Sequence, residues 1–337
     1  MKRRNALIAL VLLALVAFPN ISPAPLVYRP GEGWIYEPVG KEGKWIRTRA
    51  KDQLAVAQEA FDNKDYKIAM RAARRAVSQW PLSDYAPSAQ YLVGRCYEER
   101  KYDEKAFNEY QKIIEKYPKF EKYQEVLNRQ FEIANRFLGG QWFKLWGVIP
   151  AFSSMDKTAT MYERLIKNGP YSEVAAKAQL NIGEAREKKE NYEKAVRAYE
   201  TAADRYQGDK KLAADALYKA GLAYQKQSKT AEYDQNAAAQ AISTFTDFIA
   251  LYPQDERIPK CREIIESLKA EQARGNFQIA RFYEKRRNWD GALVYYNEVI
   301  LRDPKSDLAT QAKERIDSIK SRKPSTEAVP VATEEKK

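Results

Sequence analysis

The stretch GRCYEERKYDEKAFNEYQKIIEKYP, residues 94–118, contains the spacing that decides the fold. Its small residue Gly94 is followed by an aromatic residue three positions later, by the small residue Ala106 twelve positions later, and by Tyr110 four positions after that. The apolar residues recur at helical spacing on both sides of a polar centre, which is typical of two short amphipathic helices. Pro118 ends the stretch, since proline lacks the N–H group that a continuing helix needs. The stretch therefore predicts a helical hairpin.

The same spacing returns across residues 48–320. The six copies begin at the small residues Ala57, Gly94, Ala134, Gly183, Gly221 and Ala280, and their helix-ending positions are 81, 118, 170, 207, 253 and 304. This pattern resembles the tetratricopeptide repeat, whose base period is about 34 residues. One such hairpin cannot bury its apolar face alone, so the hairpins must stack. The sequence thus predicts an all-α fold, a right-handed superhelical solenoid of about six tetratricopeptide-like hairpins, with an irregular helical bundle as the alternative.

The size of the residue at each position of the repeat suggests where that residue packs. We expect the small residues to lie where the paired helices cross, and the aromatic residues to fill the gap between one repeat and the next. Three insertions break the period: an aromatic segment at 139–157, an excess of eight residues between 225 and 239, and an extra helix between 253 and 270. Insertions in repeat proteins often gather on a functional face.

The chain begins with a basic segment and an apolar run from Ala6 to Phe18. This run is too short to cross a hydrocarbon core of about 30 Å at about 1.5 Å per residue. We interpret residues 1–24 as an export signal peptide, with an uncleaved anchor as the alternative. The other predicted segments are an extended arm at 25–47, repeats one to three at 48–170, repeats four to six at 171–320 and a disordered tail at 321–337.

Composition excludes most catalytic chemistry. The chain has no histidine, which removes catalytic triads and histidine-ligated metals. Cys96 and Cys261 lie too far apart in the sequence to form a metal motif, and we interpret them as buried small residues, with a long-range disulfide as the alternative. There is no phosphate-binding glycine loop. We therefore expect no catalytic residues, no metal and no cofactor.

The net charge of +12 suits an anionic surface, but acidic residues are interspersed with basic ones, so nucleic acid is not an expected partner.

The phrases WPLSDYAPSAQ (80–90) and YEKRRNWDGAL (283–293), with the export signal and the repeats, resemble the BamD-like family. These are periplasmic repeat proteins of the outer-membrane β-barrel assembly machinery. The resemblance implies a scaffold at the inner face of the outer membrane, bound to unfolded outer-membrane proteins and to the periplasmic domains of the barrel insertase.

The family carries a lipidated cysteine directly after the signal, whereas Pro23, Ala24 and Pro25 stand here. Attachment to the membrane is therefore expected to be peripheral, through a partner or through an uncleaved signal. The alternative function is a different periplasmic tetratricopeptide scaffold, linked to peptidoglycan or to cell division.

Three groups of residues are the candidate binding sites. The first helix of each repeat lines the groove of a tetratricopeptide array, and helical counting places in it Leu54, Gln58, Phe61, Tyr91, Arg95 and Glu98. The corresponding surface of the last repeat, suited to an acidic docking partner, comprises Arg281, Glu284, Lys285 and Arg286. The aromatic insertion offers Trp142, Phe143 and Trp146 to a membrane interface or a partner. A solvated helix face, or an insertion folded back over the array, is the alternative for each group. The arm aromatics Trp34, Tyr36 and Trp45 are expected to pack along the first repeats.

Overall fold

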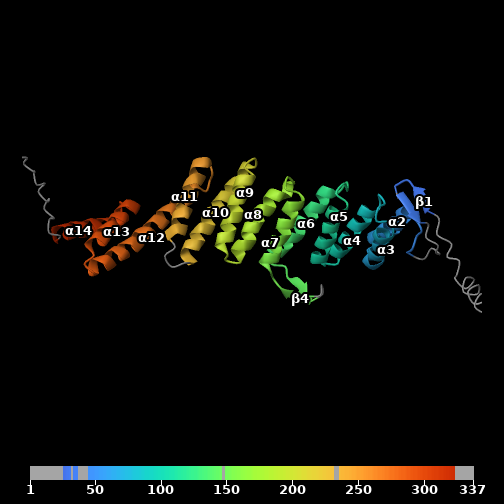
Figure 1. Ribbon diagram of the computed structural model, residues 1–337, viewed down its shortest axis with the longest axis horizontal. Helices are drawn as coiled ribbons and strands as arrows, with labels where there is room; N and C mark the ends of the chain where they lie inside the picture. Colours follow the sequence, from blue (N-terminus) through green and yellow to red (C-terminus); the bar gives the residue numbers. More distant parts are fainter. Residues whose placement is uncertain (1–25, 32, 37–44, 146–148, 231–234, 323–337) are drawn as a thin grey trace, which may run out of the picture. The chain divides into compact units, whose positions relative to one another are not determined.

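A computed structural model describes residues 26–31, 33–36, 45–145, 149–230 and 235–322. The predicted signal peptide and nearly all of the predicted tail lie outside these residues. Within them the chain forms thirteen helices and two short β-hairpins (Figure 1). The predicted all-α tetratricopeptide fold is confirmed.

Twelve of the helices form the six predicted hairpins. In chain order the pairs are α2 (Ala50–Asp62) and α3 (Tyr66–Gln79), α4 (Ala86–Glu99) and α5 (Asp103–Lys116), α6 (Tyr123–Leu138) and α7 (Met155–Asn168), α8 (Glu173–Lys188) and α9 (Tyr192–Arg205), α10 (Lys210–Thr230) and α11 (Gln235–Leu251), α12 (Ile258–Lys285) and α13 (Trp289–Arg302). A last helix, α14 (Asp307–Arg322), packs on the sixth pair and covers its apolar face.

The described helices belong to two compact units. Unit 1 comprises the chain up to residue 133 together with residues 142–152, and unit 2 comprises residues 134–141 and the chain from residue 153 onward. Each unit buries its own apolar residues between neighbouring helices, as expected for hairpins that stabilise one another by stacking.

Local sequence sets the ends of the helices. Every second helix ends two residues before its helix-ending position, for example at Lys116 before Pro118. Four hairpins turn through a residue with positive φ, such as Lys64 and Glu190. In these two turns the next residue then begins the second helix: the side chains of Asp65 and Asn191 accept a hydrogen bond from a backbone N–H of the first turn.

The small and aromatic residues of the repeat meet within one hairpin. A Cβ atom on Gly94 would lie 2.4 Å from the ring of Tyr110, and a Cβ on Gly183 would lie 2.3 Å from the ring of Tyr199. The missing side chain therefore makes the room that the ring of the paired helix fills. The prediction of close helix contact is confirmed, whereas the aromatic ring packs against its own repeat as well as toward the next.

The insertions take two forms. Residues 139–157 contain a hairpin of β3 (Phe143–Leu145) and β4 (Ile149–Phe152). The predicted extra helix after Pro253 is continuous with the first helix of the last repeat, which makes α12 a single helix of 28 residues.

Within the N-terminal arm, β1 (Leu26–Arg29) and β2 (Gly33–Tyr36) pair as an antiparallel hairpin. Of its aromatic residues, Trp45 packs on the first core cluster, as expected. Trp34 is 68% exposed and contacts Tyr28, so the expectation that it packs along the repeats is wrong. The side chain of Tyr36 is not part of what the structure describes.

Both cysteines are free thiols buried inside helices α4 and α12, which confirms their interpretation as buried small residues. Burial raises the pKa of Cys96 to about 12 and that of Cys261 to about 11. Neither thiol is therefore available for attachment of a lipid without unfolding of its helix.

Candidate functional site

One hydrogen bond recurs inside the repeats and involves two of the predicted site residues. The hydroxyl of Tyr110 donates to Glu98 over 2.8 Å, and the two residues lie twelve positions apart. The same spacing joins Tyr199 to Glu187 over 2.7 Å and Tyr296 to Glu284 over 2.6 Å. Glu98 and Glu284 therefore hold their hairpins together from inside, in addition to any contact with a partner.

The predicted groove residues of α4 belong to a network that continues onto α6. Arg129 donates to the hydroxyl of Tyr91 over 2.8 Å and lies 3.3 Å from Glu98 and 3.2 Å from Glu125. Tyr91 also donates to Glu125. The first helices of repeats two and three are thus joined along one face of unit 1.

The charges of this network are stable near neutral pH. Burial, followed by the bond to Glu125, raises the pKa of Tyr91 above its ordinary value. Burial acts to raise the pKa of Glu125 as well, but the hydrogen bonds from Tyr91 and Arg129 outweigh it and lower that pKa. A neutral phenol and a charged carboxylate result, which suits binding rather than proton transfer.

The other groove residues extend the same face onto α2. The guanidinium carbon of Arg95 lies 5.3 Å from the centre of the Phe61 ring, which links the first helices of repeats one and two. Leu54 is half-buried, and Gln58 is exposed and donates to Asp62 over 2.8 Å. Of the six predicted residues, the structure joins Phe61 to Arg95 and Tyr91 to Glu98 through Arg129, while Leu54 and Gln58 lie on α2 outside these contacts.

Buried glutamines are structural residues that the sequence analysis missed. Gln53 and Gln179 each lie four residues before the small residue of their repeat. Each donates to a backbone carbonyl of the second helix nineteen residues later, over 3.2 Å and 3.1 Å. The signal was present in the sequence, because glutamine stands at this position in each of the first four repeats.

The predicted docking residues lie at the end of α12. Arg281, Lys285 and Arg286 are exposed. The guanidinium of Arg286 lies 4.2 Å from the ring centre of Phe282, which is itself half-exposed. Glu284 differs from the other three, because it accepts the Tyr296 hydroxyl and lies 3.6 Å from Arg315.

The aromatic residues of the insertion separate into two kinds. Trp142 is 54% exposed, whereas Phe143 is 2% exposed and stacks on Phe152 with ring centres 6.1 Å apart. Trp146 lies outside the described residues. Of the two described residues, Trp142 therefore has a side chain that a membrane or partner can reach.

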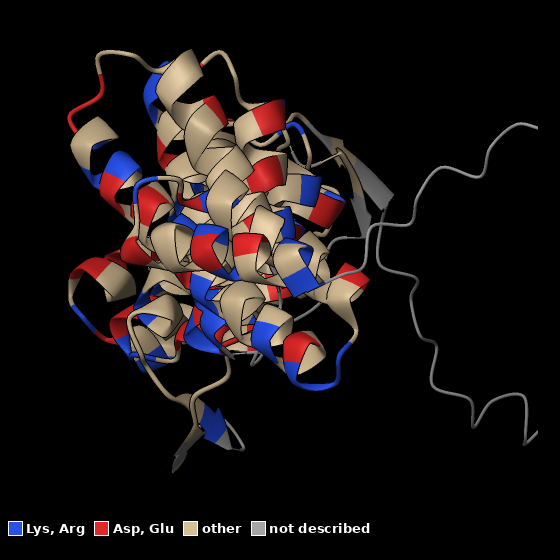
Figure 2. Ribbon diagram, turned by 90° about the vertical axis from the view of Figure 1, so that its left-hand side faces the viewer, with Lys and Arg blue, Asp and Glu red and all other residues tan. Residues whose placement is uncertain are grey.

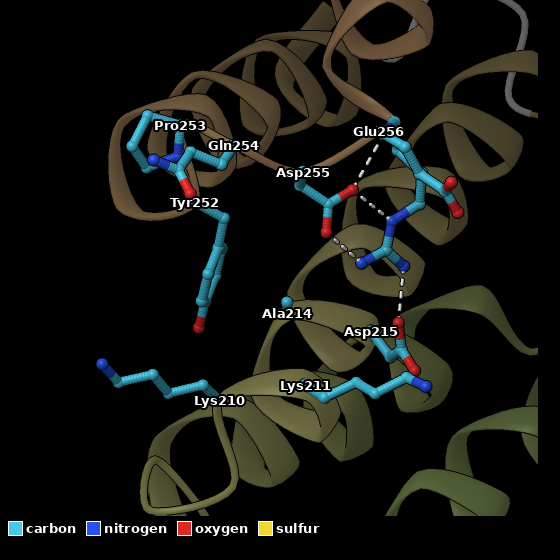
Figure 3. A pocket seen from close by; sticks show the side chains of 10 residues that line it. Lys210, Lys211, Ala214, Asp215, Tyr252, Pro253, Gln254, Asp255 and Glu256 are labelled. Carbon is cyan, nitrogen blue, oxygen red and sulfur yellow. Dashed lines mark hydrogen bonds and ion pairs between the residues drawn. The ribbon is translucent and has the colours of Figure 1, made fainter.

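Unit 2 contains an open cavity of about 760 Å³ where the connection between α11 and α12 passes the start of α10 (Figure 3). Its charged residues include Lys210, Lys211 and Arg257. Arg257 bonds to Asp255 over 2.7 and 2.8 Å and to Asp215 over 2.6 Å. The hydrogen bonds that Arg257 donates to Asp255 lower the pKa of that carboxyl.

Three further properties of the part of the chain that the structure describes are the grouping of its Cys, Asp and Glu side chains, the hydropathy of its helices and its surface charge. It holds no group of three or more Cys, Asp or Glu side chains arranged for a metal ion. None of its helices has both the length and the hydropathy needed to span a bilayer. Basic and acidic residues alternate over the helices that face the viewer in Figure 2.

Two family models match the chain. Residues 151–314 match YfiO, an outer membrane lipoprotein family, and residues 88–119 match a tetratricopeptide repeat. No curated protein gives a significant match.

Solved structures of repeat proteins are similar over most of the chain. A tetratricopeptide protein from Bacteroides fragilis is 16% identical, with 82% of this chain and 100% of that chain covered and a TM-score of 0.38. The C-terminal part of a protein from Cytophaga hutchinsonii is 14% identical, with 78% and 87% covered and a TM-score of 0.35. MamA from Desulfovibrio magneticus is 14% identical, with 61% and 97% covered and a TM-score of 0.33.

Proposed function

Because the chain is a BamD-like tetratricopeptide-repeat protein, we propose that it is a non-enzymatic scaffold of the machinery that assembles β-barrel proteins into the outer membrane. The match of residues 151–314 to an outer membrane lipoprotein family carries the proposal. The proposed location is the periplasm, at the inner face of that membrane. The proposed partners are the barrel insertase, through its periplasmic domains, and unfolded outer-membrane proteins.

The first helices of unit 1 are the proposed site for extended segments of unfolded barrels. Such segments alternate apolar and polar side chains. The face offers the ring of Phe61 beside the guanidinium of Arg95, and the half-buried Leu54 one turn away from the exposed Gln58. Apolar contacts with a charged anchor suit an extended peptide.

A photo-crosslinker placed at Gln58 tests this site. We expect it to capture a peptide with the sequence of a barrel strand, and we expect a crosslinker at Lys67, exposed on the second helix of the same repeat, to capture several-fold less. Equal capture at the two positions would show that the first-helix face has no preference for the peptide.

The exposed cations at the end of α12 are the proposed docking site for an acidic surface of the insertase's periplasmic domains. Arg281 and Lys285 point from the helix without the internal bonds that Glu284 makes. The double substitution Arg281→Glu, Lys285→Glu is expected to abolish co-purification of the insertase. The control Lys313→Glu, Lys320→Glu makes the same charge change on the exposed face of α14 and is expected to leave co-purification intact.

Depletion of the protein in the cell tests the function as a whole. Loss of folded barrels, measured by their heat-modifiable migration on gels, is the expected result. Normal barrel levels with an altered envelope shape would instead favour a scaffold of peptidoglycan synthesis or cell division.

A further inference from the structure

Unit 1 gathers basic side chains around two tyrosine rings where the β3–β4 hairpin meets the turn between α4 and α5. We call this group the tyrosine–cation cluster; it comprises Arg74, Arg100, Lys105 and Lys144 around Tyr97 and Tyr102. Its members come from α3, α4, α5, β3 and the turn between α4 and α5, so the fold assembles the cluster from residues as far apart as 74 and 144.

Each cation lies over a ring face. The Lys144 ammonium is 4.8 Å from the centre of the Tyr102 ring, and Arg100 and Lys105 lie 5.2 and 5.3 Å from the same ring. Arg74 lies 5.4 Å from the Tyr97 ring and donates to its hydroxyl. A ring quadrupole attracts a cation but does not neutralise its charge.

Aromatic rings, rather than ion pairs, hold the cations of the cluster, although Glu99, Asp103 and Glu104 lie in the same turn of the chain. Among the described residues, no ion pair joins a carboxylate to any of its four cations, and Glu99, next to Arg100 in the chain, pairs instead with Arg95 at 3.4 Å. Arg74, Arg100 and Lys105 are exposed. Exposed cations that form no ion pair keep N–H groups with which they can contact an anionic partner.

Exposed apolar residues lie on the hairpin beside these cations. Trp142 is 54% exposed, Ile149 53% and Phe152 41%. The hairpin is tied to the helices because Lys144, a member of the cluster, donates to the backbone oxygen of Lys101 over 2.6 Å. β4 extends beyond the ends of the helices of its unit (Figures 1 and 2).

We propose that the tyrosine–cation cluster and the β3–β4 hairpin form a surface that binds an anionic phospholipid bilayer. The cations contact lipid phosphates, and Trp142, Ile149 and Phe152 enter the boundary between headgroups and acyl chains. Exposed tryptophan and aliphatic residues rimmed by basic residues are the composition that this boundary favours. A soluble acidic partner would account for the cations but leave the apolar side chains unexplained.

A bilayer as the ligand also agrees with the match of residues 151–314 to an outer membrane lipoprotein family. This inference holds whether or not the protein assists barrel assembly.

Binding of the full chain to vesicles tests the proposal, with a local readout that the apolar N-terminal segment does not control. An environment-sensitive dye is attached to Trp142→Cys, since both native thiols are buried. We expect a blue shift of its emission with phosphatidylglycerol vesicles and none with phosphatidylcholine vesicles. The triple substitution Arg100→Gln, Lys101→Gln, Lys105→Gln should weaken the dye-reported binding roughly 100-fold, because each basic residue near an anionic surface contributes about fivefold.

A matched control separates the cluster from net charge. Lys67→Gln, Lys116→Gln, Lys119→Gln removes the same charge from exposed positions elsewhere in unit 1 and should weaken binding less than about threefold. A second variant, Ile149→Ser, Phe152→Ser, should abolish the blue shift while circular dichroism stays unchanged.

Three outcomes would overturn the proposal. The first is a dye emission that does not shift although the chain sediments with vesicles, because another part of the chain would then bind the bilayer. The second is equal weakening by the triple variant and its control. The third is a blue shift with inorganic phosphate or with an acidic polypeptide but not with vesicles, which would identify a site for a soluble anion.

Discussion

Arginine lies on aromatic rings in both units of the molecule, with opposite electrostatic surroundings. In unit 2 the guanidinium of Arg257 is 4.9 Å from the Tyr218 ring and 5.2 Å from the Phe248 ring, and it also bonds to Asp215 and Asp255. In unit 1 the cations of the tyrosine–cation cluster lie over the rings and form no ion pair with a carboxylate among the described residues.

This difference separates a cation that holds the fold from cations that remain available to a partner. The carboxylates around Arg257 accept a hydrogen bond from each of its three guanidinium nitrogens and fix the chain where α11 turns into α12. The cations over the Tyr97 and Tyr102 rings form no ion pair among the described residues, so they remain able to contact an anionic surface. Substitutions at the two sites should therefore have unlike effects on stability.

The largest effect is expected from Arg257→Met. This change leaves the two aspartates without their partner and removes the guanidinium from two rings, so it should lower the free energy of unfolding by about 2–3 kcal/mol. Urea denaturation measures this free energy of unfolding. Lys260→Met, at an exposed lysine that pairs only with exposed Glu263, should change it by less than about 0.5 kcal/mol. A similar loss of stability in both variants would show that Arg257 stabilises the fold no more than an exposed lysine does.

A smaller effect is expected from acid. The hydrogen bond from Arg257 lowers the folded-state pKa of Asp255, so this bond stabilises the protein at pH above the unfolded value near 4 and is lost as the pH falls through the lower folded value. The stability difference between the wild type and Asp255→Asn should be about 1 kcal/mol at pH 7 and should vanish toward pH 2. Urea midpoints measured over this range check the sign. A constant difference would show that charge is not its source.

The repeat itself was predictable from sequence because its apolar and small positions repeat in register. Gly94, Ala106 and Tyr110 predicted the close hairpin that the structure contains. The buried Gln53 and the internally bonded Glu98 were not predicted as structural residues, because a polar residue on an amphipathic helix ordinarily faces water. The strands of the 139–157 insertion were missed because three or four residues carry too little alternation to indicate a strand.

The candidate sites were less predictable, because they depend on contacts between distant residues. Helical counting placed Tyr91 and Arg95 on the first-helix face, but their neighbours Arg129 and Phe61 become partners only once the hairpins stack. Lys144 joins the tyrosine–cation cluster through a hairpin whose strands the sequence did not indicate. The spacing within one helix therefore identified single site residues, whereas the stacking of the hairpins determined which residues they contact.

A third effect, of similar size, is expected from Tyr102→Leu. Three cations lose the ring face that attracts them while their mutual repulsion remains, so the free energy of unfolding should fall by about 1 kcal/mol. Tyr102→Phe keeps the ring and should change it by less than about 0.5 kcal/mol. Thermal unfolding at low salt is the measurement, and equal losses in the two variants would assign the effect to the hydroxyl.

The smallest effect is expected from Arg100→Gln, Lys101→Gln, Lys105→Gln, the same variant that should abolish most vesicle binding. Removing Arg100 and Lys105 gives up their attraction to the Tyr102 ring, but removing these two cations and the neighbouring Lys101 also relieves their repulsion, and the two contributions nearly cancel. The free energy of unfolding should stay within about 0.5 kcal/mol of the wild type. Added salt should stabilise the wild type more than the variant, because screening over about 10 Å weakens only the repulsion that the variant no longer has. Loss of stability on the scale of Arg257→Met would mean that these cations hold the fold and are not free to bind an anionic surface.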